Sequence, residues 1–70
     1  MMNSRYIPLG DPFILLSWVN MKLRDECKDL EQLCDRYEVS EEIIRDTLGA
    51  VGYVYVKKTN QFIYKDAATE

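Results

Sequence analysis

The sequence predicts an α+β domain in which three helices are followed by a two-stranded antiparallel β-hairpin. Two observations carry this prediction. Apolar residues recur at helical spacing from residue 12 to residue 51, with capping residues before each helical stretch. The apolar period then changes to that of a β-strand. A chain of 70 residues has room for one domain. We expect an extended arm over residues 1–10, a compact domain over residues 11–65 and a frayed tail over residues 66–70.

The first helix should begin with Asp11 as its N-cap and Pro12 at its first position, and it should extend to about Arg24. Its apolar side chains cover about 220° of the circumference, which leaves a polar strip of Ser17, Asn20 and Arg24. An ordinary surface helix has a narrower apolar stripe. This helix must therefore be covered on more than one side, either by the rest of the domain or by a second subunit.

Capping residues mark the next two helices. Asp29, with Gln32 three positions later, resembles a capping box and starts the second helix. Ser40 caps the third helix, and Gly52 is a natural stop for it. The apolar spacing predicts that these two helices bury Leu30, Leu33, Cys34, Tyr37, Ile43, Ile44, Leu48 and Val51.

The hairpin is predicted from two alternating segments, residues 53–56 and 61–64, which flank a polar four-residue turn. Its side chains sort into two faces: Val54, Val56 and Ile63 on one, and Tyr53, Tyr55, Phe62 and Tyr64 on the other. If the aliphatic face packs on the helices, the four aromatic rings form a candidate interaction surface for a partner, for a second copy or for stacked bases. Alternatively, the N-terminal arm covers the rings, or the sheet is turned over with the rings inward.

Residues 29–52 resemble a helix-turn-helix, and the hairpin resembles the wing of a winged-helix protein. The resemblance rests on the spacing of Leu33, Cys34, Val39, Ser40, Ile44 and Leu48. One departure is Glu38, which stands where the motif usually has a glycine that permits a left-handed backbone. The resemblance implies a winged-helix-like arrangement of the whole domain.

The charge distribution argues against reading DNA with the third helix. The net charge is −3, and residues 29–50 contain seven acidic and two basic side chains. The side chains that would meet the bases are Glu41, Glu42, Arg45 and Asp46. As a set they would repel phosphates, whose contacts with lysine and arginine supply most of the affinity. Nucleic-acid binding is therefore the alternative function. It would use the wing and the basic end of the first helix, with candidate contacts at Lys57, Lys58 and Lys28.

The residue inventory does not favour catalysis or cofactor binding. The sequence has no histidine, no glycine-rich phosphate loop and no nucleophile beside an evident base, so we expect neither an enzyme nor a cofactor. Cys27 and Cys34 alone cannot complete a metal site. We expect Cys34 to be buried and Cys27 to be the more exposed thiol. The sequence lacks a secretory signal and a membrane-spanning apolar run, which predicts a cytoplasmic protein.

A polar cluster of Asn20, Lys22, Arg24 and Asp25 follows the apolar part of the first helix. Lys22 lies amid the apolar arc, where it can either contact an anion or partner or lay its stem over apolar surface.

This cluster belongs to a wider set of residues that resembles a known family. The set comprises Asp11-Pro12-Phe13, the stretch from Val19 to Asp25, Leu33-Cys34, Gly52-Tyr53 and Asn60-Gln61-Phe62. Over residues 11–63 the chain resembles a family of short bacterial proteins, a domain of unknown function, which is marked by the Asn-Met-Lys-Leu-Arg-Asp stretch. The resemblance implies a compact bacterial protein with no assigned activity, and it directs attention to Asn20, Lys22, Arg24 and Asp25.

Excess apolar surface predicts a non-catalytic protein-interaction module that binds a protein partner or forms a homodimer. A domain this short buries only about 60% of the surface that its unfolded chain exposes. Self-association is a common way for small domains to recover stability.

Overall fold

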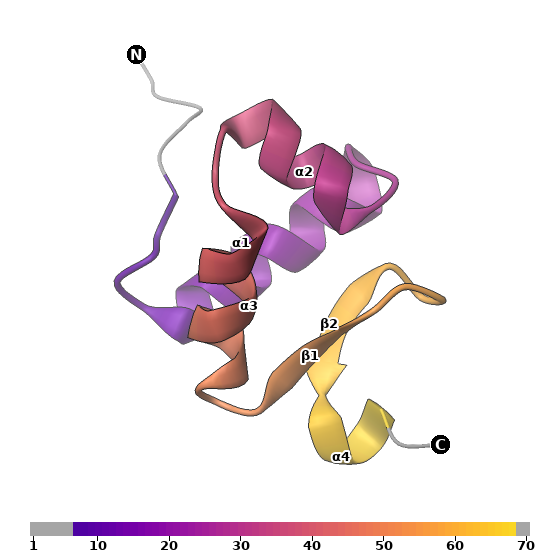
Figure 1. Cartoon of the computed structure of the whole chain (residues 1–70). Coiled ribbons are helices and arrows are strands. Elements are labelled where there is room, and N and C mark those ends of the chain that lie inside the picture. The colour runs from indigo at the N-terminus through magenta and orange to yellow at the C-terminus, as the bar shows by residue number, and fades with distance from the viewer. Residues whose placement is uncertain (1–6, 69–70) are drawn as a thin grey trace.

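The computed structural model describes residues 7–68 and confirms the α+β prediction, with three helices followed by an antiparallel hairpin (Figure 1). The expectations for residues 1–6 of the arm and for residues 69 and 70 of the tail lie outside the described residues. The elements are α1 (Pro12–Asp25), α2 (Leu30–Tyr37), α3 (Glu41–Gly49), β1 (Tyr53–Val56), β2 (Gln61–Tyr64) and α4 (Lys65–Ala68).

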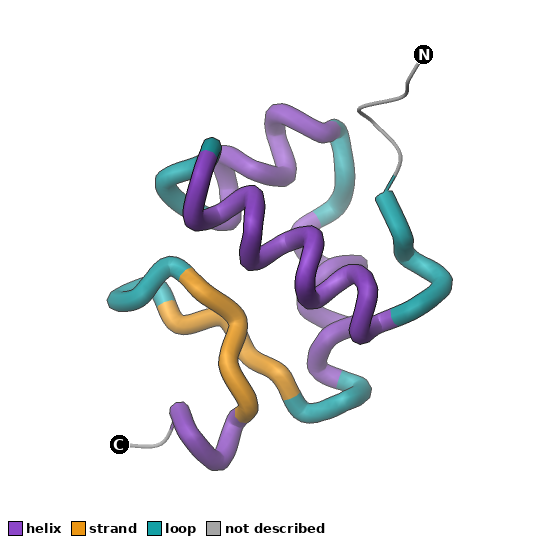
Figure 2. Tube along the Cα trace, turned by 180° about the vertical axis from the view of Figure 1, so that it is seen from behind, coloured by secondary structure: helices purple, strands orange, loops and turns teal. Residues whose placement is uncertain are grey.

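Helix α1 is the central element, and it packs against α2, α3 and β2 (Figure 1). It begins where the sequence predicts, because the Asp11 carboxylate accepts hydrogen bonds from the backbone N–H groups of Phe13 (3.0 Å) and Ile14 (3.2 Å). The face that points into the domain is formed by Leu15, Val19 and Leu23, which are buried at successive turns. The opposite face of α1 lies at the front of Figure 2, with no other element drawn over it.

Helices α2 and α3 are joined by a tight turn at residues 38–40. Glu38 adopts the left-handed conformation (φ 57°, ψ 48°) that the sequence motif usually reserves for glycine. The glutamate therefore tolerates the turn geometry, at a backbone cost of about 1–2 kcal/mol. The Asp29 carboxylate caps α2 through the N–H of Gln32 at 2.7 Å, and the Ser40 hydroxyl faces the N–H of Ile43 at 3.5 Å.

The hairpin pairs Tyr53 with Tyr64 and Tyr55 with Phe62, which is the register that keeps the predicted faces together. The turn closes with a hydrogen bond from the N–H of Asn60 to the carbonyl of Val56 at 2.8 Å, and Asn60 is left-handed (φ 57°). After β2, residues 65–68 form the short helix α4 instead of a frayed tail. The N–H of Lys65 donates to the carbonyl of Gly52 at 2.8 Å, which connects the start of α4 to the start of β1.

The core gathers between α1, α2, α3 and the inner face of the hairpin. It consists of Leu15, Val19, Leu23, Cys27, Leu30, Leu33, Cys34, Tyr37, Ile44, Leu48 and Phe62. Cys34 is buried, as expected. The expectation for Cys27 was wrong, because its side chain is only 4% exposed against 9% for Cys34. The reason is local, because the N–H of Cys27 bonds to the Lys22 carbonyl at 2.9 Å. This bond turns the connection after α1 toward the core.

Candidate functional site

The aromatic face of the hairpin turns toward the helices, which is the inward alternative of the sequence analysis and not the exposed aromatic surface. Phe62 is 2% exposed, and Tyr53 and Tyr55 are half-buried against the core. Tyr64 is the most exposed of the four at 46%, and it lies edge-on to Tyr53 at 5.4 Å between ring centroids. The physical reason is size, because aromatic rings bury far more apolar area than valines do. Val54, on the other face, is left 39% exposed.

Asn20 of the polar cluster fixes the hairpin on α1. Its side-chain amide donates to the carbonyl of Phe62 at 3.0 Å, and its side-chain oxygen accepts from the N–H of Phe62 at 2.8 Å. These are the two bonds that a residue of a neighbouring strand would make. The Gln61 side chain returns the contact by donating to the backbone carbonyl of Asn20 at 3.1 Å. Asn20 thus takes the place of a third strand along the open edge of β2.

Asn60 secures the other end of the hairpin. Its side-chain amide donates to the carbonyls of Leu23 (3.0 Å) and Cys27 (3.1 Å), which satisfies acceptors at the C-terminal end of α1. Its side-chain oxygen accepts from the Tyr55 hydroxyl at 2.7 Å, and that hydroxyl in turn accepts from the N–H of Leu30 at 3.3 Å. One chain of hydrogen bonds therefore connects α1, the hairpin and the first turn of α2.

Lys22 is placed as in the second of the two arrangements that the sequence allows, with its stem over apolar surface. Its ammonium lies 5.8 Å from the ring centroid of Trp18 and 5.5 Å from that of Tyr37, and it pairs with Glu26 at 3.1 Å. The hydrogen bond to Glu26 holds the pKa of Lys22 above its usual value. The pKa of Glu26 is lowered, first by the Tyr37 hydroxyl that donates to it at 2.7 Å and then by Lys22.

Arg24 and Asp25 are placed differently from the other members of the cluster. Both side chains are exposed at the end of α1, and the Arg24 guanidinium donates to the neighbouring Asp25 carboxylate at 3.0 Å. The structure therefore brings Asn20 into the fold, uses Lys22 to cover two rings, and leaves the last pair on the surface.

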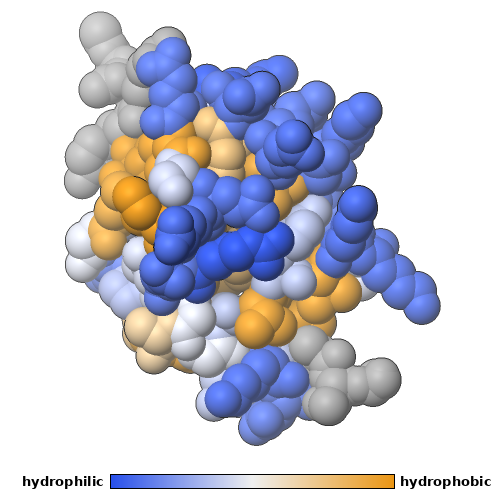
Figure 3. Space-filling model, viewed as in Figure 1, coloured by the Kyte–Doolittle hydropathy of each residue, from blue (hydrophilic) through white to orange (hydrophobic). Residues whose placement is uncertain are grey.

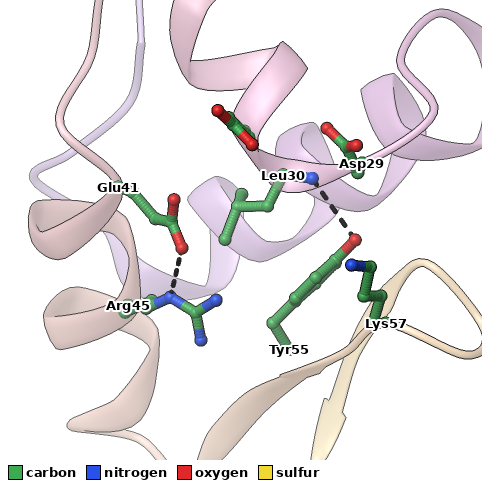
Figure 4. A pocket seen from close by; sticks show the side chains of 7 residues that line it. Asp29, Leu30, Glu41, Arg45, Tyr55 and Lys57 are labelled. Carbon is green, nitrogen blue, oxygen red and sulfur yellow. Dashed lines mark hydrogen bonds and ion pairs between the residues drawn. The ribbon is translucent and has the colours of Figure 1, made fainter.

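A small pocket lies between the first turns of α2 and α3 and strand β1 (Figure 4). Its volume is about 150 Å³, and its walls are Asp29, Leu30, Glu31, Glu41, Arg45, Tyr55 and Lys57. The Arg45 guanidinium donates to Glu41 at 2.8 Å and lies 5.6 Å from the centroid of the Tyr55 ring. Sequence reasoning missed this pocket because its walls come from three separate elements and form no local motif.

A family model matches residues 10–62, which is most of the chain. The chain belongs to the family described as Domain of unknown function (DUF4250). No curated protein and no solved structure shows a significant similarity to the chain. Within residues 7–68 of this DUF4250 protein, no cluster of histidine, cysteine, aspartate or glutamate is placed to hold a metal ion. Nor does any helix in that range have the length and apolar character required to cross a bilayer.

The outer face of α1 carries three exposed large apolar side chains. Phe13, Ile14 and Met21 are 58%, 56% and 43% exposed. With the exposed Ser17 they lie within about 100° of one another around the helix, opposite the buried face. We call these four residues the α1 outer face. The predicted polar strip along this helix is therefore narrow, and apolar side chains flank it.

The reverse side of the molecule, seen in Figure 3, is mostly hydrophilic, with hydrophobic residues gathered where residues 7–10 run beside α3. On α3, Glu42, Arg45 and Asp46 are exposed, and Glu41 is half-buried in its ion pair with Arg45. The predicted excess of negative charge on this helix is thus on the surface. The candidate nucleic-acid contacts Lys57, Lys58 and Lys28 are also exposed. Lys57 and Lys58 lie in the hairpin turn, and Asn60 of that turn bonds to the carbonyl of Cys27, the residue before Lys28.

Proposed function

We propose that this DUF4250 protein is a non-catalytic protein-interaction module that docks through the α1 outer face, with a protein partner or a second copy of the chain as the occupant. The observation that carries the proposal is the concentration of exposed apolar side chains on one helix whose other side is already buried. Scattered exposed apolar residues are normal, but a contiguous group on one helix face is typical of a docking surface.

The energetic argument supports docking at this face. Full burial of a large apolar side chain contributes about 1.5–3 kcal/mol. Phe13, Ile14 and Met21 are each about half exposed, so covering all three would contribute on the order of 2–4 kcal/mol before the costs of association. That is enough for a weak or regulated contact, and neighbouring polar contacts would have to add specificity.

Site-specific photo-crosslinking in the cells that produce the protein tests this function. A photoreactive benzoylphenylalanine placed at Ser17 should form a covalent adduct, whereas the same group at Thr59 in the hairpin turn should not. Ile14→Asp in the Ser17-labelled protein should abolish the adduct, and Val54→Asp, which adds the same charge on the hairpin, should leave it. Equal labelling at both positions, or an adduct that survives Ile14→Asp, would contradict docking through this face.

Nucleic-acid binding is the second candidate function, and the observation in its favour is that the hairpin turn with Lys57 and Lys58 bonds to the residue before Lys28. Asp29 and Glu31 line the same pocket as Lys57 and offset its charge. A mobility-shift experiment with random duplex and single-stranded DNA and RNA at about 50 mM salt is the appropriate test, because electrostatic binding is strongest at low salt. Lack of retention there would remove this candidate.

A further inference from the structure

We propose that the occupant of the α1 outer face is the same face of a second copy, with the two α1 helices antiparallel and a twofold axis beside Ser17. This inference rests on the proposed function and specifies its partner. In a twofold contact the same surface is used by both copies and must therefore be self-complementary. Two independent features of α1 meet that requirement: the order of its side chains and the placement of its charges.

The side chains are arranged symmetrically about Ser17. Phe13 and Met21 lie four residues before and after it, so each is displaced by about 6 Å along the helix axis. When a second α1 lies antiparallel with Ser17 on the axis, Phe13 of each copy meets Met21 of the other, and Ile14 packs beside this contact. The small serine in the middle allows the backbones to approach to the usual interhelical distance of about 8–10 Å.

The charges favour the antiparallel over the parallel arrangement. Asp11 lies six residues before Ser17, and Arg24 lies seven residues after it, and both are exposed. The antiparallel pair therefore places Arg24 of one copy at about the same level along the helix axis as Asp11 of the other, twice. It also places Asp25 near the positive N-terminal end of the opposing helix. A parallel pair would instead bring Arg24 against Arg24 and align the two helix dipoles.

The size of the face determines how tight the dimer should be. Helix α1 has 14 residues and is therefore about 21 Å long. A standard interface covers about 800 Å² on each partner, which is about a sixth of the 4620 Å² surface of this chain. One helix of this length covers less than that, so we expect a weak dimer whose population rises with protein concentration between the micromolar and the millimolar range.

Disulfide trapping of purified Ser17→Cys protein tests the geometry. A disulfide requires the two Cβ atoms to be about 3.5–4.5 Å apart, and a residue can meet its own copy at that distance only beside the twofold axis. The native thiols do not interfere, because Cys27 and Cys34 are buried. Under mild oxidation at about 50 µM protein, Ser17→Cys should form at least five times more covalent dimer than the control Thr59→Cys, whose position is also exposed.

Light scattering from about 1 µM to 1 mM provides the second measurement. The wild type should move from monomer to dimer across this range, and Met21→Asp should raise the dissociation constant at least tenfold, whereas Val54→Asp should leave it unchanged. A wild-type dimer without enhanced crosslinking of Ser17→Cys would overturn the antiparallel arrangement. A strictly monomeric wild type would overturn self-pairing altogether. In either case a photo-adduct at Ser17 with a mass other than that of the dimer would still support docking of a different partner, so the two proposals fail separately.

Discussion

Replacing Asn20 with alanine is expected to destabilise the domain by about 2–3 kcal/mol. The substitution removes both hydrogen bonds to Phe62, at 2.8 and 3.0 Å, and leaves the backbone N–H and carbonyl on the edge of β2 without partners. An orphaned buried polar group costs about 1–3 kcal/mol, and the lower half of that range applies here because the site is partly buried. A domain of this size has a total stability of about 4–10 kcal/mol, so the loss is large.

Urea unfolding followed by circular dichroism measures this loss, and the melting temperature should fall by about 10 °C or more. Ser17→Ala, on the exposed side of the same helix, is the matched control and should change the free energy of unfolding by less than about 0.5 kcal/mol. Asn20→Asp adds a test of donor identity. The ionised carboxylate of Asn20→Asp can accept from the Phe62 N–H, but it has no donor for the Phe62 carbonyl and repels it. At acid pH the protonated carboxyl group regains a donor, so the stability of this variant relative to the wild type should improve as the pH falls. A loss below about 0.5 kcal/mol in Asn20→Ala would refute the strand-like role of this residue.

Three further predictions address the hairpin and the core. Asn60→Gly keeps the left-handed turn but removes the amide contacts, and urea unfolding should show a loss of about 1–3 kcal/mol, with Asn60→Ala worse because alanine disfavours φ 57°. Gly52→Ala should cost about 2 kcal/mol, because φ is +92° and the new Cβ would lie 2.6 Å from the Tyr64 ring. Gly49→Ala, which meets open space in α3, should instead stabilise by about 0.5 kcal/mol. Burial raises the pKa of the Cys34 thiol from 9.0 to about 11. Its contribution to stability is therefore present below pH 9 and falls by about 2–3 kcal/mol as the pH rises to 11. In pH-dependent unfolding, Cys34→Ala should lose less stability over this range by that amount, while Cys27, Tyr37 and Tyr55, whose pKa values burial also raises, still contribute to the slope.

The helices could be predicted closely because their signals are local. Asp11, Asp29 and Ser40 are side chains that accept hydrogen bonds two or three residues away, so the sequence contains both partners of each cap. The apolar period identifies the buried side of α2 and most of that of α3, but the prediction that Ile43 is buried was wrong, because its side chain lies at the edge of the apolar stripe and is 47% exposed. The left-handed conformation of Glu38 shows the limit of such rules, because a glutamate ends α2 in a geometry that its own preference opposes, with its N–H bonded to the Cys34 carbonyl.

The orientation of the hairpin could not be predicted from the strand period alone. Alternation assigns Val54 and Tyr55 to opposite faces, but both faces are apolar, so the pattern does not identify the buried one. The choice depends on contacts between residues far apart in the sequence, such as the 42-residue separation between Asn20 and Phe62. The short helix α4 was missed for a related reason, since its first N–H bonds to the carbonyl of Gly52 at the start of β1.

These contacts change what the polar cluster on α1 means. Asn20 is a structural residue, because both hydrogen-bonding groups of its side chain are directed at the backbone of β2. Lys22 covers two rings and pairs with Glu26, which also belongs to the fold. Arg24 and Asp25 are exposed and contact each other at the end of α1. If the cluster has a role outside the fold, Arg24 and Asp25 are the residues that can perform it. They lie at the C-terminal end of α1, next to the α1 outer face.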